Sequence, residues 1–256
     1  MSIDSWNAEL ALDRAALWRL AAALLRYPNR HGLAELRSEP MWARALDAAQ
    51  RFEGASLREA ILTAHETLNA STDDALEYSH GCCFGHTVRG PVPAYESEWG
   101  KADGLLQPHR IADLSAFYRA HGLVLSPGAE RADHVSVQAE FLHFLACKAA
   151  RATLGGDGPL VEACEESTCK LLSDHLAQFA PAFTRRLASI GDSGIYRHAG
   201  QVLRALIEIE CRSRDIATGD DALPLRTVSF AEDAACVSCA LRPSAAEANG
   251  EDHGEN

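Results

Sequence analysis

The chain has 256 residues, 47% of them hydrophobic, and a formal net charge of −12. This length suits one large domain or two small ones with a real core, and the acidic balance excludes nucleic-acid binding through a general basic surface. No stretch reaches the roughly 18 uninterrupted apolar residues of a membrane span, and the N-terminus carries Asp4 where a signal peptide has basic residues. We therefore expect a cytoplasmic protein without stable membrane insertion, whose eight cysteines are reduced, metal-bound or redox-active.

Apolar residues recur at helical spacing, and no period-two run is long enough for a strand. In chain order we expect helices over residues 6–26, 41–52, 56–69, 71–81, 109–121, 133–154 and 159–179, a shorter one from Pro181, and a last one over 192–216. Asp133 is the expected N-cap of its helix, and Gly122 the expected end of the helix before it. A long loop with several Gly and Pro residues occupies 85–107. The pattern predicts an all-α, single-domain helical bundle.

The C-terminal residues are acidic, contain Gly and Ala, and show no periodicity. We expect a helical domain at residues 1–218 and a flexible tail at 219–256. The tail carries a Cys-x-x-Cys motif, whose spacing can place two sulfurs on one metal ion. One such pair is half a zinc site, so a metal- or cluster-binding accessory protein stays open beside a spare thiol pair. The weak metal candidates are Cys236, Cys239, Cys82 and Cys83.

Two segments have the spacing Glu-x-x-His, which is typical of di-iron carboxylate bundles. They are Glu77 with His80, and Glu140 with His143. Roughly one such match is expected by chance in a chain of this composition, and Gly81 follows His80 at once. A di-iron enzyme is therefore an alternative that the spacing does not favour.

Asp133 and Glu140 stand two helical turns apart and share one helix face. The simplest interpretation is an N-cap and a solvated acid. Glu140, however, borders the apolar residues Val137, Phe141 and Phe144. An acid at such an edge needs water or a donor, such as an incoming arginine.

The ordered set of motifs between residues 91 and 145 resembles the TorD/DmsD/NarJ family, the cytoplasmic chaperones of molybdenum-dependent oxidoreductases. The resemblance is carried by Tyr95-Glu96-Ser97 after a Pro-rich loop, Phe117-Tyr118 before Gly122-Leu123, and Asp133-His134 before Glu140-Phe141. Weaker likeness extends over residues 10–215. Gln138 departs from the pattern, because the family often has an acid or an apolar residue there, and so do the cysteine pairs.

The resemblance implies an all-helical, non-catalytic chaperone that requires no cofactor of its own. Its partner would be the catalytic subunit of a molybdenum oxidoreductase, or that subunit's twin-arginine signal peptide. Binding would delay export until molybdopterin guanine dinucleotide is inserted, and a delta-type chaperone of a respiratory enzyme is one possible subgroup. By position, the partner-binding residues are Tyr95, Glu96, Ser97, Tyr118, Asp133, His134, Glu140 and Phe141.

Carboxylates can pair with the two arginines of such a signal peptide, and an apolar groove between helices can take its apolar stretch. The identity of the client, and whether the chaperone is a monomer or a homodimer, stay open.

Overall fold

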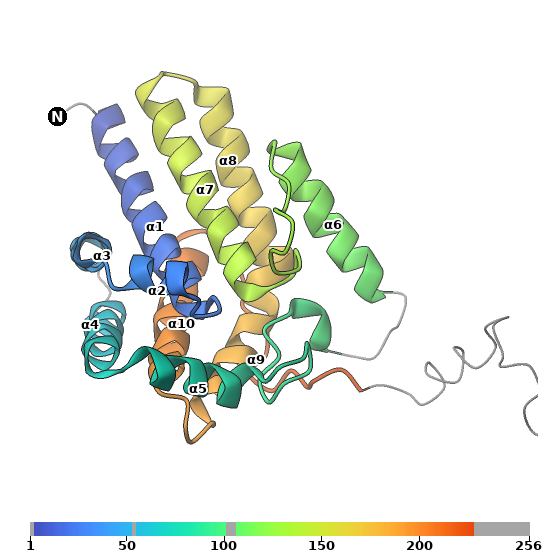
Figure 1. Cartoon of the computed structure of the whole chain (residues 1–256). Coiled ribbons are helices and arrows are strands. Elements are labelled where there is room, and N and C mark those ends of the chain that lie inside the picture. Colours follow the sequence, from blue (N-terminus) through green and yellow to red (C-terminus); the bar gives the residue numbers. More distant parts are fainter. Residues whose placement is uncertain (1–2, 53–54, 101–105, 228–256) are drawn as a thin grey trace, which may run out of the picture. The chain divides into compact units, whose positions relative to one another are not determined.

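A computed structural model describes residues 3–52, 55–100 and 106–227 (Figure 1). Within these ranges the chain is all-α and has no strand, as predicted. The helices are α1 (Ile3–Leu25), α2 (Arg30–Leu36), α3 (Glu39–Arg51), α4 (Ala55–Ala70), α5 (Asp73–Phe84), α6 (Leu106–Ala120), α7 (Val135–Leu154), α8 (Gly158–Leu171), α9 (Ala177–Ala188) and α10 (Ile195–Ser213). A 3₁₀ turn, η1 (Glu96–Glu98), interrupts the long loop, and a π-helical turn, η2 (Leu172–Leu176), joins α8 to α9.

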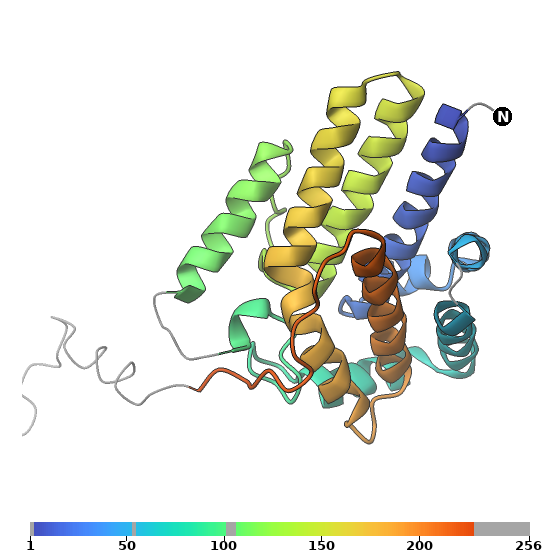
Figure 2. The same cartoon turned by 180° about the vertical axis from the view of Figure 1, so that it is seen from behind.

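The helix α7 occupies the middle of the bundle, with α1 on one side and α8 on the other (Figures 1 and 2). The contact between α1 and α7 is the most extensive in the bundle. Small residues are buried along both helices, including Ala11 and Ala15 on α1 and Ala139 and Ala149 on α7. Because the distance between packed helices depends on the side chains at the contact, these alanines let the two backbones come close.

The remaining helices complete the core around this pair. The helix α10 packs against α1, α4, α5 and α9, and α3 packs against α1 and α4. Trp18 of α1 and Trp42 of α3 are among the largest fully buried side chains. No helix in the described ranges is long and apolar enough to cross a membrane.

The helices differ from the sequence prediction most clearly in three places. The helix expected over 159–179 ends at Leu171 and is followed by the π-helical turn η2. The short helix α2 was not expected; Asn29 caps it by accepting a hydrogen bond from the Gly32 amide. Pro181 does not start a helix but lies inside α9. A proline has no N–H for the carbonyl four residues earlier, and the carbonyl of Ala177 instead accepts a hydrogen bond of 2.9 Å from the Gly219 amide.

Residues beyond the last helix also contact the bundle. The backbone of Gly100 donates to Pro224 at 2.8 Å, and that of Arg226 donates to Glu98 at 2.8 Å. The compact unit therefore extends to Arg226. A domain boundary after residue 218 stays a prediction, and Cys236 and Cys239 of the expected tail lie outside the described residues.

Candidate partner-binding site

The long loop and the start of α7 are joined by main-chain hydrogen bonds. Tyr95 and His134 form an isolated antiparallel bridge. The Val135 amide donates to the Ala94 carbonyl at 2.8 Å, and the Glu96 amide donates to the Asp133 carbonyl at 2.9 Å. The motifs that are separated in sequence therefore come together at the N-terminal end of α7.

Asp133 is fully buried, and its carboxylate organises this junction. It accepts hydrogen bonds from the Ser97 amide at 3.1 Å and from Arg131 Nε and Nη2 at 2.8 and 2.9 Å. Arg131 also donates to Ser97 Oγ at 2.8 Å and lies over the Tyr95 ring, 4.4 Å from its centroid. The carboxylate is thus neutralised and bonded inside the chain, as burial requires.

The expected N-cap of α7 is wrong by one residue. His134, not Asp133, occupies that position, and its Nδ1 accepts a hydrogen bond from the Ser136 amide. The side chain of Asp133 faces the loop instead, where it accepts hydrogen bonds from the Ser97 amide and from Arg131. Burial lowers the pKa of His134 to about 4, so the ring is neutral near pH 7 and can accept this bond.

Glu96 is buried in a second cluster next to the first. Its carboxylate accepts a hydrogen bond of 2.9 Å from Gln138 Nε2 and lies 3.1 Å from Nδ1 of His175. The ring of His175 comes from the π-helical turn between α8 and α9. The contact between Glu96 and His175 could not be predicted from local sequence patterns, since 79 positions separate the two residues. Gln138, which departs from the family pattern, serves here as a donor to Glu96.

The two tyrosines of the predicted set are bonded within the loop region. Tyr95 donates its hydroxyl to Glu130 at 2.6 Å, and Tyr118 of α6 donates to the Ala132 carbonyl at 2.8 Å. Burial raises the pKa of both hydroxyls. They therefore stay protonated and act as donors at neutral pH.

Glu140 and Phe141 lie outside this polar junction. The side chain of Glu140 is 59% exposed and pairs with Arg26 of α1 at 3.3 Å. Phe141 is buried in contact with Phe117, Tyr118 and Phe144. Of the predicted partner-binding residues, the structure thus brings Tyr95, Glu96, Ser97, Asp133 and His134 together, packs Tyr118 and Phe141 beside them, and leaves Glu140 at the surface.

A cavity of about 400 Å³ opens beside Glu140, and we call it the α7 groove. The segment 123–129 after α6 forms one wall, and α7 forms the other. Val124 at 78% exposure and Leu125 at 41% stand on the first wall. The lining comprises Tyr118, Leu123, Val124, Leu125, Ser126, Ala129, Val137, Glu140, Phe141, His143, Phe144 and Cys147. Sequence reasoning missed Val124 and Leu125, because exposed apolar residues in a loop carry no periodic signal.

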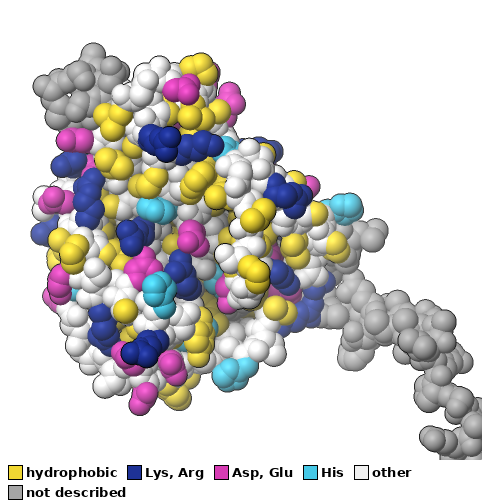
Figure 3. Space-filling model, turned by 45° about the horizontal axis from the view of Figure 1, so that its top comes forward, with side chains coloured by type: hydrophobic (Ala, Val, Ile, Leu, Met, Phe, Trp, Pro, Cys, Tyr) yellow, Lys and Arg dark blue, Asp and Glu magenta, His cyan; other side chains and the backbone are white. Residues whose placement is uncertain are grey.

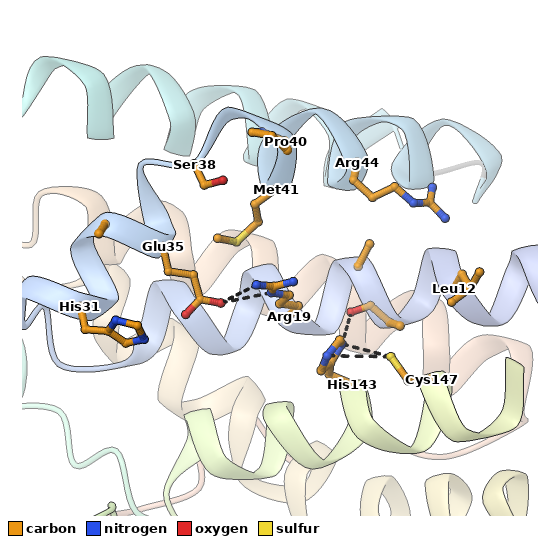
Figure 4. Close-up of a pocket in the computed structure, with 13 residues that line it drawn as sticks. Leu12, Arg19, His31, Glu35, Ser38, Pro40, Met41, Arg44, His143 and Cys147 are labelled. Carbon is orange, nitrogen blue, oxygen red and sulfur yellow. Dashed lines mark hydrogen bonds and ion pairs between the residues drawn. The ribbon is translucent and has the colours of Figure 1, made fainter. Parts of the chain in front are cut away.

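A second cavity of about 750 Å³ lies on the other side of α7, between α1, α2 and α3 (Figure 4). Arg19 and Glu35 pair across it at 3.0 Å. His143 and Cys147 of α7 form its far wall, where His143 Nδ1 donates to the Ala15 carbonyl at 2.8 Å. The same two residues line the α7 groove, so the cavities share a wall.

On the face shown in Figure 3, charged side chains of both signs are mixed. Figure 3 shows basic and acidic side chains interspersed with hydrophobic ones over the face in view. Around the α7 groove, Arg26 lies within 4 Å of both Glu35 and Glu140. Arg26 therefore has two acidic partners beside this rim.

The two Glu-x-x-His segments do not assemble into a metal site. His80 packs among the rings of Tyr27, Phe84 and Tyr196, and Glu140 pairs with Arg26. In the part of the chain that the structure describes, no three His, Cys, Asp or Glu side chains gather to hold a metal ion. The di-iron alternative thus lacks its ligand set.

Cys82 and Cys83 both lie in α5, and burial raises the pKa of the Cys83 thiol to about 12. The proposed companions Cys236 and Cys239 lie outside the described residues.

No curated protein sequence matches the chain. The family model of the nitrate reductase delta subunit matches residues 45–185. These residues include η1, α6, α7 and the turn that carries His175, and they make up more than half of the chain. The chain therefore belongs to the nitrate reductase delta subunit family, within the redox enzyme maturation proteins that act as chaperones of molybdenum enzymes.

Proposed function

We propose that this chain is a cytoplasmic, non-catalytic chaperone that binds the precursor of a molybdenum oxidoreductase. Binding holds the precursor, through its twin-arginine signal peptide or its apo-subunit, until molybdopterin guanine dinucleotide is inserted and export can follow. The chaperone requires no cofactor of its own. Family membership supports the kind of partner, and the α7 groove supports the mode of binding.

The observation that carries this proposal is an apolar groove with an accessible carboxylate on its rim. Val124 and Leu125 present apolar surface to solvent, and Glu140 borders the same cavity. A twin-arginine signal peptide offers two arginines followed by an apolar stretch. An amphipathic segment places its apolar face in such a groove, and Glu140 can exchange its partner Arg26 for an arginine of the peptide.

The buried residues have a supporting role in this proposal. Glu96, Ser97, Asp133 and His134 already have partners inside the chain. They hold the long loop against the N-terminal end of α7. Direct contact of Glu96 or Asp133 with an arginine requires the loop to open, which makes Glu140 the first acid that a partner meets.

The test measures how much precursor the purified chaperone recovers. It compares the native chain with two variants, each of which changes one exposed apolar residue to Asp. The probe is a molybdenum oxidoreductase precursor that carries a twin-arginine signal peptide. Val124→Asp places a charge in the groove and is expected to lower recovery at least tenfold, since desolvating a carboxylate opposes docking. Leu154→Asp is the matched control, because Leu154 is 67% exposed and lies at the end of α7, away from the groove.

Glu140→Lys tests the rim in the same assay. It replaces attraction with repulsion toward an incoming arginine, so a smaller loss of recovery is expected that shrinks at high salt. A second probe, the precursor without its signal peptide, separates binding of the signal peptide from binding of the mature subunit. Equal recovery by native chain, Val124→Asp and Leu154→Asp would show that the groove is not the binding site.

A further inference from the structure

The segment after α10 crosses α9 and reaches the site loop (Figure 2). We call residues 217–226 the C-terminal strap. Its first contacts are with the start of α9, and its last contacts are with Glu98, Trp99 and Gly100. The strap therefore connects the end of the bundle to the loop that carries Glu96 and Ser97.

The first attachment depends on Pro181. Because Pro181 has no N–H, the Ala177 carbonyl has no helical donor, and the Gly219 amide takes its place at 2.9 Å. The approach is close: a Cβ on Gly219 would lie 2.0 Å from the Gln178 carbonyl oxygen. Only glycine fits at this point of the strap.

The second attachment is a short antiparallel pairing. Leu225 and Trp99 form an isolated bridge, with hydrogen bonds of 2.8 Å from Gly100 to Pro224 and from Arg226 to Glu98. These bonds use main-chain atoms alone. Any extended segment can make them, as in recognition by strand addition.

Glu98 adds a preference for arginine to this pairing. Its carboxylate is buried and accepts hydrogen bonds from Arg89 Nε at 3.0 Å and Gln107 Nε2 at 2.9 Å. Arg226 Nη2 of the strap lies 3.6 Å from the same carboxylate. A buried carboxylate needs cationic partners, so a segment that replaces the strap is favoured when it brings its own guanidinium.

The strap buries less apolar surface than the helices do. Leu223 and Leu225 are only partly buried. Its bidentate ion pair, Asp221 with Arg204 at 2.7 and 3.1 Å, lies at the surface, where such pairs contribute little. Segments with few buried contacts open at lower cost than the core.

We propose that the strap is an internal competitor for the client. An extended, arginine-bearing segment of the precursor displaces residues 224–226, pairs with the main chain at 98–100 and places a guanidinium at Glu98. The inference rests on the proposed function and adds to it a second contact with the client and a contact that keeps this surface closed in the free chaperone.

The test uses two strap-releasing variants and one matched control in the full-length chain. Gly219→Ala introduces the clash with the Gln178 carbonyl, and Arg226→Pro removes both the N–H and the guanidinium. Gly191→Ala is the control, because a Cβ there meets nothing within 4 Å. The probe is a labelled peptide with the strap sequence 219–227, added in trans, and circular dichroism checks that each variant is folded.

We expect the strap peptide to bind Gly219→Ala and Arg226→Pro about tenfold more tightly than it binds the native chain or Gly191→Ala. The same peptide with Gln in place of its Arg226 should bind the released variants more weakly. A peptide with the precursor's two arginines should displace the strap peptide, and the released variants should also recover more precursor.

Equal affinities of native and released chains for the strap peptide would overturn the inference, as would equal binding of the Arg and Gln peptides. If the native chain recovers the precursor and strap release changes nothing, the strap inference fails and the proposed function stands. If no chain, native or released, recovers the precursor, the proposed function fails first and the inference falls with it.

Discussion

Asp133 and His134 are adjacent in the chain, but their side chains serve different parts of the structure. The carboxylate binds the long loop through Ser97 and Arg131, and the imidazole caps α7 through Ser136. The order of the motif could be predicted from the sequence. Which of the two residues caps α7 and which binds the long loop could not be predicted, because both residue types accept hydrogen bonds. The choice depends on where Ser97 lies in the folded chain.

Replacing Asp133 should lower the free energy of unfolding, because its buried carboxylate holds several donors. Asp133→Ala removes the carboxylate acceptor of Arg131 and of the Ser97 amide and leaves Arg131 only its bond to Ser97 Oγ. We expect a loss of about 2–3 kcal/mol in the free energy of unfolding, discounted because Arg131 is partly exposed. Denaturant titration measures it. Asp174→Ala, which breaks the exposed pair with Lys170, is the control and should change stability by less than about 1 kcal/mol. Equal losses would contradict the role assigned to Asp133.

The buried ring of His134 predicts a loss of stability in mild acid. Its pKa is about 4 in the folded chain and near 6.5 when exposed, so the unfolded chain binds a proton first. The neutral ring's contribution to stability is complete above about pH 6.5 and is lost as the pH falls toward 4. The stability lost by pH 5 is about 2 kcal/mol. His134→Asn keeps an N-cap acceptor and cannot titrate.

Denaturant titrations at pH 7.5 and pH 5 should therefore show a smaller acid loss for His134→Asn than for the native chain. His80, whose pKa burial also lowers to about 4, keeps some acid sensitivity in both chains. Identical losses in the two chains would mean that His134 does not titrate as its burial requires.

At the scale of elements, the helices with strong periodicity were predicted well. The helix α1 was expected at 6–26, and α7 at 133–154, close to the observed bounds. The short helix α2 was not predicted, because its seven residues contain too few apolar positions to show a helical period. The interior position of Pro181 was not predicted, because the residue that donates to the Ala177 carbonyl in its place, Gly219, is distant in sequence.

The long loop meets the end of α5 at Gly90, where the two backbones come too close for a side chain. A Cβ at Gly90 would lie 1.7 Å from the Phe84 carbonyl oxygen. Gly90→Ala should therefore push the loop off α5 and cost about 2–3 kcal/mol.

Gly81→Ala is the matched control, since it lies within α5 and a Cβ there meets nothing within 4 Å. It should be neutral or stabilise by up to about 1 kcal/mol through helix propensity. Thermal and denaturant unfolding of both variants would check this pair, and a destabilised Gly81→Ala with an unaffected Gly90→Ala would contradict it.

At the scale of the whole molecule, the class of fold followed from composition and periodicity, whereas the contacts of residues 219–226 did not. Residues 219–226 are acidic and aperiodic, so their sequence resembles a tail. They are held by the Ala177 carbonyl and by the main chain of the site loop. Neither contact can be predicted from the local sequence, because both partners are distant in the chain. The position of the groove was equally hidden, because it depends on how the 123–129 segment lies against α7.

Two shortened chains would locate the end of the folded unit. A chain that ends after residue 226 should keep the melting temperature of the full chain. One that ends after residue 218 loses the pairing with Glu98 and Gly100 and the Arg204–Asp221 pair, about 2 kcal/mol in all, which lowers the melting temperature by roughly 4–8 °C. Equal melting temperatures for the two shortened chains would place the boundary at residue 218.

The wall that His143 and Cys147 form between two cavities has a thermodynamic consequence. Any occupant of the α7 groove that moves these side chains also reshapes the cavity between α1, α2 and α3. Linkage then requires reciprocity: if filling one cavity changes the affinity of the other by some factor, filling the second changes the affinity of the first by the same factor. His143 and Cys147 are the residues through which such a coupling between the two faces of the bundle would pass.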